Sequence, residues 1–222
     1  MGSTRNTPRP CPASTLPPSP DLLVDGPAGA PLTVVLAHGA GAPMDDPFLT
    51  AIAGGLGARG LHIVRFEFPY MAARRSGARK PPDRTPVLLA AWREAIAACG
   101  GARDLVLGGK SLGGRMASML ADEVGARGLV CLGYPFHPPG KPERLRTAHL
   151  ESLRTPALIV QGSRDPFGTP GEVAGYRLSP AIRLHWIEDG DHSLAPRKAS
   201  GRTRRDAQEE AIACVAEFVA AL

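Results

Sequence analysis

The chain has 222 residues, of which 43% are hydrophobic and 21% charged, and a net charge of +5. This length suffices for one sizeable core but is short for two ordinary domains, and the composition excludes a largely disordered chain. The positive excess lies in two arginine-rich runs, residues 74–84 and 197–205, without interleaved aromatic residues. We interpret them as solvated loops and expect no nucleic-acid partner, while help with an anionic substrate stays open.

Residues 1–20 are rich in Pro, Ser and Thr and hold almost nothing to bury, so we expect a flexible tail. The tail lacks the apolar run of a signal peptide, and Asn6 stands where a myristoylation signal needs Ser or Thr. No stretch approaches the roughly 20 apolar residues of a membrane helix. We therefore expect a cytoplasmic protein without membrane contact, with residues 21–222 as one domain.

Short apolar runs alternate with amphipathic stretches along the chain. In order, the sequence predicts strands at 21–25 and 32–37, a helix at 47–56, a strand at 61–66, a long Arg- and Pro-rich loop, a helix at 86–98, a strand at 104–107, a helix at 111–123, strands at 128–132, 156–161 and 181–187, and a last helix whose apolar stripe runs from 211 to 222. Such alternation is typical of an α/β fold: a mostly parallel central sheet with helices on both faces.

The motif G-x-S-x-G occurs at Gly109, Ser111 and Gly113, between a predicted strand and a predicted helix. In this context the serine lies on a tight, strained turn at the C-terminal edge of the sheet, a turn called the nucleophile elbow. A Gly-rich turn without chemistry is the plain alternative. A phosphate-binding loop would need glycine at position 104, where the chain has Asp104, so that interpretation fails on spacing.

A serine hydroxyl needs a base to take its proton, and two residues in the expected chain order supply a triad. Asp165 follows the strand at 156–161, and His192 follows the strand at 181–187, so both lie at the edge that carries Ser111. Each alone is compatible with a turn residue or a loop histidine. The rivals are less well placed, because two share the loop of His192 and two lie within strands: Asp189, Asp191, His185 and His62.

Two backbone N–H groups are expected to form an oxyanion hole. One belongs to Leu112, directly after the nucleophile, and the other we assign to Ala40, in the loop that follows an early strand. His38, in the same loop, is expected to order it through hydrogen bonds and not to act as a base.

Six segments together resemble the small, lidless α/β-hydrolases related to dienelactone hydrolases, in particular an uncharacterised bacterial branch that also has eukaryotic, chromatin-associated relatives. They are LAHGAG at 36–41, RFEFPYM at 65–71, GKSLGGR at 109–115, GYPFHPPGKP at 133–142, QGSRDPFG at 161–168 and GDH at 190–192. The resemblance implies an α/β-hydrolase fold and a triad of Ser111, Asp165 and His192. Dienelactone hydrolases usually carry cysteine in the elbow, so Ser111 puts dienelactone itself in doubt as the substrate.

About 22 residues separate Gly133 from the next strand, too few for a helical lid, so we expect an open site. Lys110 and Arg115 beside the elbow are candidates to attract an anionic substrate group, or are ordinary exposed cations. Tyr70 and Met71 line the pocket or pack under a loop. The complete set of substrate-binding candidates is His38, Gly39, Gly41, Tyr70, Met71, Lys110 and Arg115.

No metal or organic cofactor is expected. His137 and His149 have no carboxylate or cysteine at ligand spacing. The four cysteines are far apart, form no CxxC pair and are expected to be thiols: Cys11, Cys99, Cys131 and Cys214.

The sequence thus predicts a serine hydrolase that cleaves a small ester or related acyl bond. The alternative is a hydrolase-like interaction module with a dormant triad.

Overall fold

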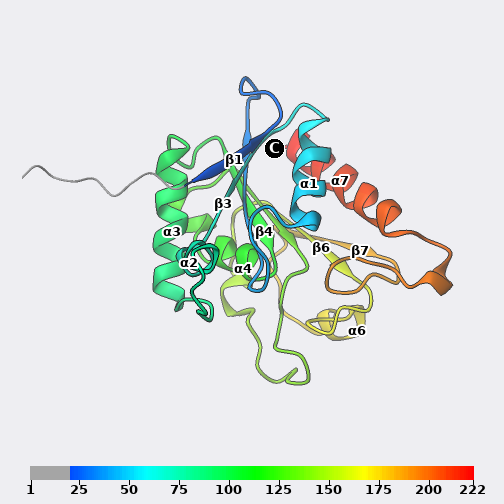
Figure 1. Ribbon diagram of the computed structural model, residues 1–222. Coiled ribbons are helices and arrows are strands. Elements are labelled where there is room, and N and C mark those ends of the chain that lie inside the picture. The colour runs from blue at the N-terminus through cyan, green and yellow to red at the C-terminus, as the bar shows by residue number, and fades with distance from the viewer. Residues whose placement is uncertain (1–20) are drawn as a thin grey trace, which may run out of the picture.

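A seven-stranded sheet forms the centre of the molecule in the computed structural model, which describes residues 21–222 (Figure 1). The strand order is β1-β3-β2-β4-β5-β6-β7. Only β1 is antiparallel to its neighbour, and the other pairs are parallel. The strands are β1 Leu22–Asp25, β2 Thr33–Ala37, β3 His62–Phe66, β4 Leu105–Lys110, β5 Gly128–Leu132, β6 Ala157–Gly162 and β7 Ile182–Ile187. The mostly parallel sheet is confirmed, whereas the expected tail at 1–20 lies outside the described residues and the single domain stays a prediction.

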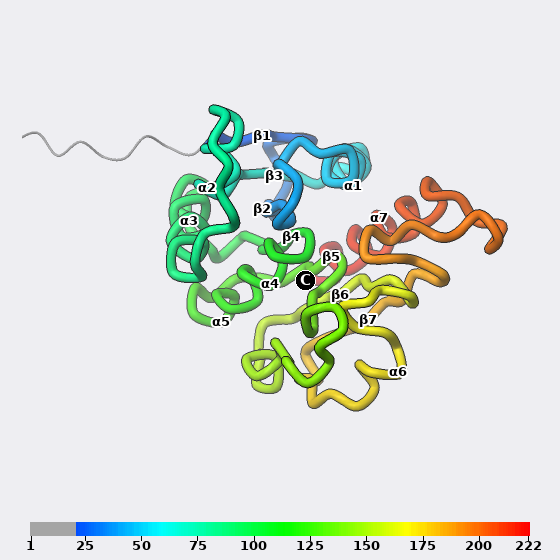
Figure 2. The backbone as a smooth tube through the Cα atoms, turned by 60° about the horizontal axis from the view of Figure 1, so that its bottom comes forward, coloured from blue at the N-terminus to red at the C-terminus, as the bar shows by residue number. Residues whose placement is uncertain are grey.

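Helices cover both faces of this sheet (Figure 2). On one face α1 (Pro47–Gly57) and α7 (Arg204–Ala220) pack on a core that includes Val34 and Leu36 of β2. The other face holds α2 (Pro69–Arg75), α3 (Thr85–Ala98), α4 (Leu112–Ser118) and α5 (Ala121–Val124), over a core that includes Val35 and Ala37. Successive residues of β2 alternate between the two cores because strand side chains point to opposite faces. A four-residue helix, α6 (Pro170–Val173), follows β6.

Local signals set the ends of the two helices on the first face. The Asp46 carboxylate accepts from the N–H groups of Phe48 and Leu49, and Pro47 occupies the first turn of α1. Thr203 and Asp206 cap each other's backbone at the start of α7.

Three predicted elements differ from the structure. The loop expected after β3 contains α2, because Pro69 is well suited to a first helical turn and Tyr70 and Met71 supply a buried face. The strand expected at 104–107 runs on to Lys110. The helix expected at 111–123 is two helices, since the chain tightens where Met119 and Leu120 bond to carbonyls three residues back.

The connection from β5 to β6 carries no lid domain, as predicted. The only helix or strand in residues 133–156 is a 3₁₀ helix, η1, at Ala148–Leu150. Among residues 21–222, no helix combines the length and the apolar character needed to cross a membrane.

Candidate active site

Ser111 occupies the sharp turn between β4 and α4. Its φ is 50° and its ψ is −110°, a conformation that few non-glycine residues adopt. Its N–H donates to the Leu132 carbonyl at 3.0 Å, and its own carbonyl accepts from Arg115 N–H at 3.0 Å. The strained backbone is therefore held from both sides, as expected where strain serves a site.

The two glycines of the motif are required by close backbone approach. A Cβ on Gly109 would lie 2.2 Å from the carbonyl oxygen of Ala37, and one on Gly113 would lie 2.3 Å from the same atom. Neither position tolerates a side chain, because β2 presses against both ends of the turn. This contact explains why glycines flank Ser111 at this spacing.

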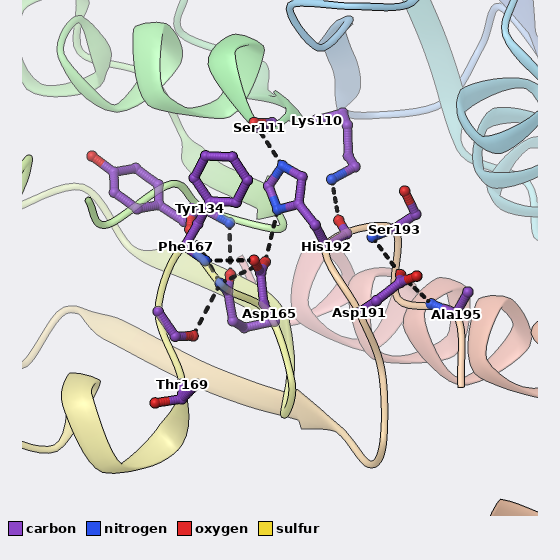
Figure 3. Close-up of polar contacts among 12 residues, drawn as sticks. Lys110, Ser111, Tyr134, Asp165, Phe167, Thr169, Asp191, His192, Ser193 and Ala195 are labelled. Atoms are coloured by element: carbon purple, nitrogen blue, oxygen red, sulfur yellow. Dashed lines mark hydrogen bonds and ion pairs between the residues drawn. The ribbon is translucent and has the colours of Figure 1, made fainter. Parts of the chain in front are cut away.

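Ser111, His192 and Asp165 form a continuous hydrogen-bonded relay (Figure 3). His192 Nε2 lies 2.9 Å from Ser111 Oγ, and His192 Nδ1 lies 2.8 Å from Asp165 Oδ2. The ionised carboxylate can only accept, so Nδ1 carries a proton and Nε2 is left to accept from the hydroxyl. The structure brings together the three residues predicted from separate loops.

Asp165 is fully buried, and each of its oxygens has a donor. Oδ1 accepts from the Phe167 N–H at 2.9 Å, and Oδ2 accepts from Gln161 Nε2 at 2.9 Å in addition to His192. The Gln161 amide in turn bonds to the N–H and carbonyl of Tyr134, at 2.6 and 3.1 Å. A buried charge needs such hydrogen-bond partners. Gln161 therefore stabilises the Asp165 carboxylate and links it to the loop that follows β5.

The turn that carries His192 is built by Asp191. Its carboxylate accepts from the N–H groups of Ser193 and Ala195 at 2.7 and 3.0 Å (Figure 3). Asp189 faces elsewhere and pairs with Arg164 and Arg197. Neither rival carboxylate therefore contacts the imidazole.

Lys110 holds the same turn from the side of the elbow. Its Nζ donates to the His192 carbonyl and lies 5.7 Å from the ring centre of Phe48. Burial lowers the pKa of the ammonium to about 8, although nearby carboxylates, that of Asp165 first, act in the opposite direction.

A buried histidine and a buried tyrosine shape the loop at 38–42. His38 Nδ1 donates to the Gly39 carbonyl at 2.7 Å, and its Nε2 accepts from the Phe68 N–H at 3.0 Å. Burial lowers the pKa of His38, which fits this neutral tautomer. The Tyr70 hydroxyl donates toward the carbonyls of Gly39 and Ala40, at 3.3 and 3.1 Å. The Ala40 carbonyl is thereby occupied and its N–H is left available.

The two expected oxyanion donors have no other use within residues 21–222. Neither the Leu112 N–H nor the Ala40 N–H donates a hydrogen bond to another described residue. Ala40 lines the same cavity as Ser111, and Leu112 directly follows Ser111 in the chain.

A cavity of about 310 Å³ opens at Ser111 and His192. Small residues of the 38–42 loop form one wall, and the rings of Phe48 and Phe167 contribute apolar surface. The Phe167 ring lies 4.2 Å from the imidazole of His192, centre to centre. The remaining lining residues are Gly39, Ala40, Gly41, Ala42, Asp46, Lys110 and Ser193.

The substrate-binding candidates divide between this cavity and its surroundings. Gly39, Gly41 and Lys110 line the cavity. His38, Tyr70 and Met71 do not, because they are 0%, 0% and 4% exposed and support the loop from beneath. Arg115 does not line it either: it lies one turn further along α4, near Tyr134 and His149.

Sequence reasoning missed several residues of the site. Gln161 gave a signal, as the one amide in an otherwise apolar strand, and Phe167 lies two residues after Asp165 on the same turn. Asp46 and Phe48 are recognisable as the capped start of a helix, but their proximity to Ser111 depends on how α1 packs.

Comparisons with known proteins agree with the fold described above. The family described as alpha/beta hydrolase domain matches residues 30–220. A dienelactone hydrolase from Anabaena variabilis superposes with a TM-score of 0.69 at 21% identity, covering 89% of each chain. A serine hydrolase without a lid from Xanthomonas campestris superposes with a TM-score of 0.62 at 21% identity, covering 86% of this chain and 87% of that one. A serine hydrolase homologue from Coxiella burnetii also has a TM-score of 0.62, at 20% identity, covering 86% of this chain and 89% of that one. At these identities the structures show a shared fold.

Proposed function

Since this chain belongs to the alpha/beta hydrolase domain family, we propose that it is a serine hydrolase that cleaves a carboxylic ester or a related acyl bond. The observation that carries the proposal is the relay from Ser111 through His192 to Asp165, with contacts of 2.9 and 2.8 Å. This order of nucleophile, base and orienting carboxylate is what acyl transfer needs.

In the first half-reaction, Ser111 Oγ attacks the substrate carbonyl carbon while His192 Nε2 takes the hydroxyl proton. Asp165 keeps the imidazole in the Nδ1–H form and stabilises the imidazolium. The N–H groups of Leu112 and Ala40 stabilise the oxyanion. The imidazolium then gives its proton to the leaving oxygen, and the bond from the acyl carbon to that oxygen breaks.

In the second half-reaction, water replaces the leaving group. His192 takes a proton from the water as it attacks the acyl-serine, and returns that proton to Ser111 Oγ as the acid departs. Every proton in this scheme is transferred by side chains of the relay, and no cofactor takes part. The cavity of about 310 Å³ favours a small acyl group.

Substitution of the nucleophile tests the proposal. Ser111→Ala should lower kcat for p-nitrophenyl acetate by roughly 10⁴- to 10⁶-fold, because the other groups cannot act without the hydroxyl. Ser200→Ala, at an exposed serine in the 3₁₀ helix Lys198–Ser200, serves as the control and should keep full turnover. Equal turnover by Ser111→Ala and the unaltered protein would refute the assignment, whereas an unaltered protein without turnover above the uncatalysed rate would favour the interaction module.

A further inference from the structure

Three basic side chains, two arginines and one histidine, come from α4 and the β5–β6 connection and do not line the cavity at Ser111. Arg115 comes from α4, and Arg146 and His149 come from the connection. His149 Nε2 lies 2.8 Å from Ser118 Oγ, whose hydroxyl donates to the Arg115 carbonyl at 2.8 Å. The Tyr134 hydroxyl donates to the Arg146 carbonyl at 2.9 Å and lies 3.4 Å from His149 Nε2. These contacts bring the His149 ring close to the backbone carbonyls of Arg115 and Arg146, and the charge of Arg115 acts on both Arg146 and His149.

No carboxylate balances this charge. Within residues 21–222, no acidic oxygen lies within 4.0 Å of a nitrogen of the Arg115 or Arg146 side chain, and residues 1–20 contain no Asp or Glu. The acids closest to these residues in sequence pair with other arginines: Glu143 with Arg144, Asp122 with Arg154 and Glu151 with Arg177.

Arg115 is also left without hydrogen-bond acceptors. Its guanidinium donates to no described residue, and its Nε is buried. A buried donor without a partner destabilises the folded state, and guanidinium groups are usually paired when they leave water. The protein therefore carries donors here that an incoming acceptor would satisfy.

The charge of Arg115 contributes to the lowered pKa values of both His149 and Arg146. Burial lowers the pKa of His149 to about 4, with the charge of Arg115 adding to the effect. The pKa of Arg146 is lowered for the same two reasons in the same order. Because the Ser118 proton is used on the Arg115 carbonyl, His149 Nε2–H donates to Ser118, and Nδ1 makes no hydrogen bond to a described residue. An anion would reverse the repulsion and allow Nδ1 to become a donor.

We propose that Arg115, Arg146 and His149 form a binding site for an oxyanion, the phosphate or carboxylate group of a ligand. Guanidinium groups match the geometry and charge of such groups, often through two parallel hydrogen bonds. The site lies one helical turn from the nucleophile, as the 3.0 Å bond from Arg115 N–H to the Ser111 carbonyl shows. The anion belongs either to a substrate held at Ser111, which rests on the proposed function, or to a separate ligand.

Phosphate binding tests the site without any catalysis. The full chain carrying Ser111→Ala is titrated with inorganic phosphate against chloride at constant ionic strength, and the Tm and the NMR signals of the His149 ring are followed. We expect phosphate to raise the Tm and to raise the pKa of His149. Arg115→Met and Arg146→Met should each weaken binding at least about 10-fold, whereas Arg144→Met, at an exposed neighbour, should leave it unchanged.

Two checks keep the result interpretable. The Tm of each variant in chloride shows whether it folds. Arg115→Lys keeps the positive charge but loses the planar guanidinium that can form two parallel hydrogen bonds, so it should bind phosphate with intermediate affinity. Absence of a phosphate response in the folded parent protein would overturn the proposal. An equal response in the parent, Arg115→Met and Arg146→Met would do the same.

The source of the anion is read from turnover by the protein with Ser111 intact. If the anion is part of the substrate, p-nitrophenyl monoesters of dicarboxylic acids should exceed p-nitrophenyl acetate in kcat/KM about 10-fold or more. Arg115→Met should remove this preference, and phosphate should compete. If phosphate binds but no preference exists, the site takes a separate ligand. Should all esters fail, the proposed function fails, while the phosphate titration still decides on the site.

Discussion

Two polar clusters lie one helical turn apart along α4, and they differ in how their charges are matched. In the triad, the fully buried Asp165 accepts from His192, Phe167 and Gln161, so that each group has a partner. In the second cluster, the charge of Arg115 acts against that of Arg146, and no carboxylate of residues 21–222 pairs with either side chain. The first arrangement is complete in itself, as the proposed function requires of a preorganised reaction centre. The second becomes complete only when an anion is added.

The largest effect on kcat should follow from substitution of Asp165, whose carboxylate has a hydrogen-bond donor for each oxygen. Asp165→Asn keeps the shape but presents an amide to the imidazole, which favours the wrong tautomer, and kcat should fall by about 10³- to 10⁴-fold. Asp189→Asn, which alters the rival carboxylate paired with Arg197, should change kcat less than about 3-fold. Turnover of p-nitrophenyl acetate per folded enzyme measures both. Similar losses in the two variants would remove Asp165 from its assigned role.

Removal of the Gln161 amide, which donates to Asp165, should have the next largest effect on kcat. Gln161→Leu leaves Asp165 Oδ2 with one donor fewer and the Tyr134 N–H without its acceptor. The free energy of unfolding should therefore fall by about 2 to 4 kcal/mol, and kcat by about 10-fold. Thr155→Val, at the other end of β6, removes a buried hydroxyl bonded to Asp122 and should lower stability without changing kcat. Urea unfolding and ester turnover, measured on both variants, separate the two roles. A normal kcat in Gln161→Leu would contradict a link between this amide and the triad.

The cluster of Arg115, Arg146 and His149 predicts a pH dependence of the free energy of unfolding. The folded-state pKa of His149 lies near 4, below its ordinary value of 6.5, so the folded protein binds fewer protons than the unfolded chain between these values. Stability should therefore fall as the pH drops from 6.5 to 4, by roughly 1 to 3 kcal/mol relative to His149→Gln. Arg115→Met should raise the pKa of His149 and reduce this loss. Urea unfolding at a series of pH values and NMR titration give the two quantities. A His149 pKa unchanged by the substitution would place Arg115 outside the cluster.

The smallest effect is expected at Lys110, which holds the His192 turn without joining the relay. Lys110→Met removes the bond to the His192 carbonyl and should lower kcat about 3- to 10-fold. Stability should change little, because removal of a buried ammonium also removes its desolvation cost. Steady-state kinetics and thermal unfolding provide the measurements. A loss as large as that of Asp165→Asn would mean that Lys110 takes part in proton transfer.

Much of the fold and the triad could be predicted because both depend on short-range patterns. The strand at 128–132 was predicted with the bounds of β5, since it is a continuous apolar run. The proximity of Ser111, Asp165 and His192 was predicted from their positions after the strands β4, β6 and β7, because parallel strands bring their C-terminal ends to one edge of a sheet.

The remainder depended on packing between distant segments. Tyr70 and Met71 follow the right strand to reach the cavity, yet the helix α2 turns both side chains into the core. Arg115 was recognised as a cation beside the elbow, but its neighbours His149 and Arg146 come from a connection whose path the sequence pattern does not reveal. Gln161 was grouped with an apolar strand, and only its contacts with Asp165 and Tyr134 show its role.

Covalent labelling of Ser111 tests the central claim most directly, because it needs no knowledge of the substrate. A fluorophosphonate should react with the folded protein and place one adduct on Ser111, identified by mass spectrometry of its peptide. Ser111→Ala should remain unlabelled, and His192→Ala should react at least about 10³-fold more slowly. A folded protein that stays unlabelled, or one labelled elsewhere with Ser111 free, would contradict the account of a working triad.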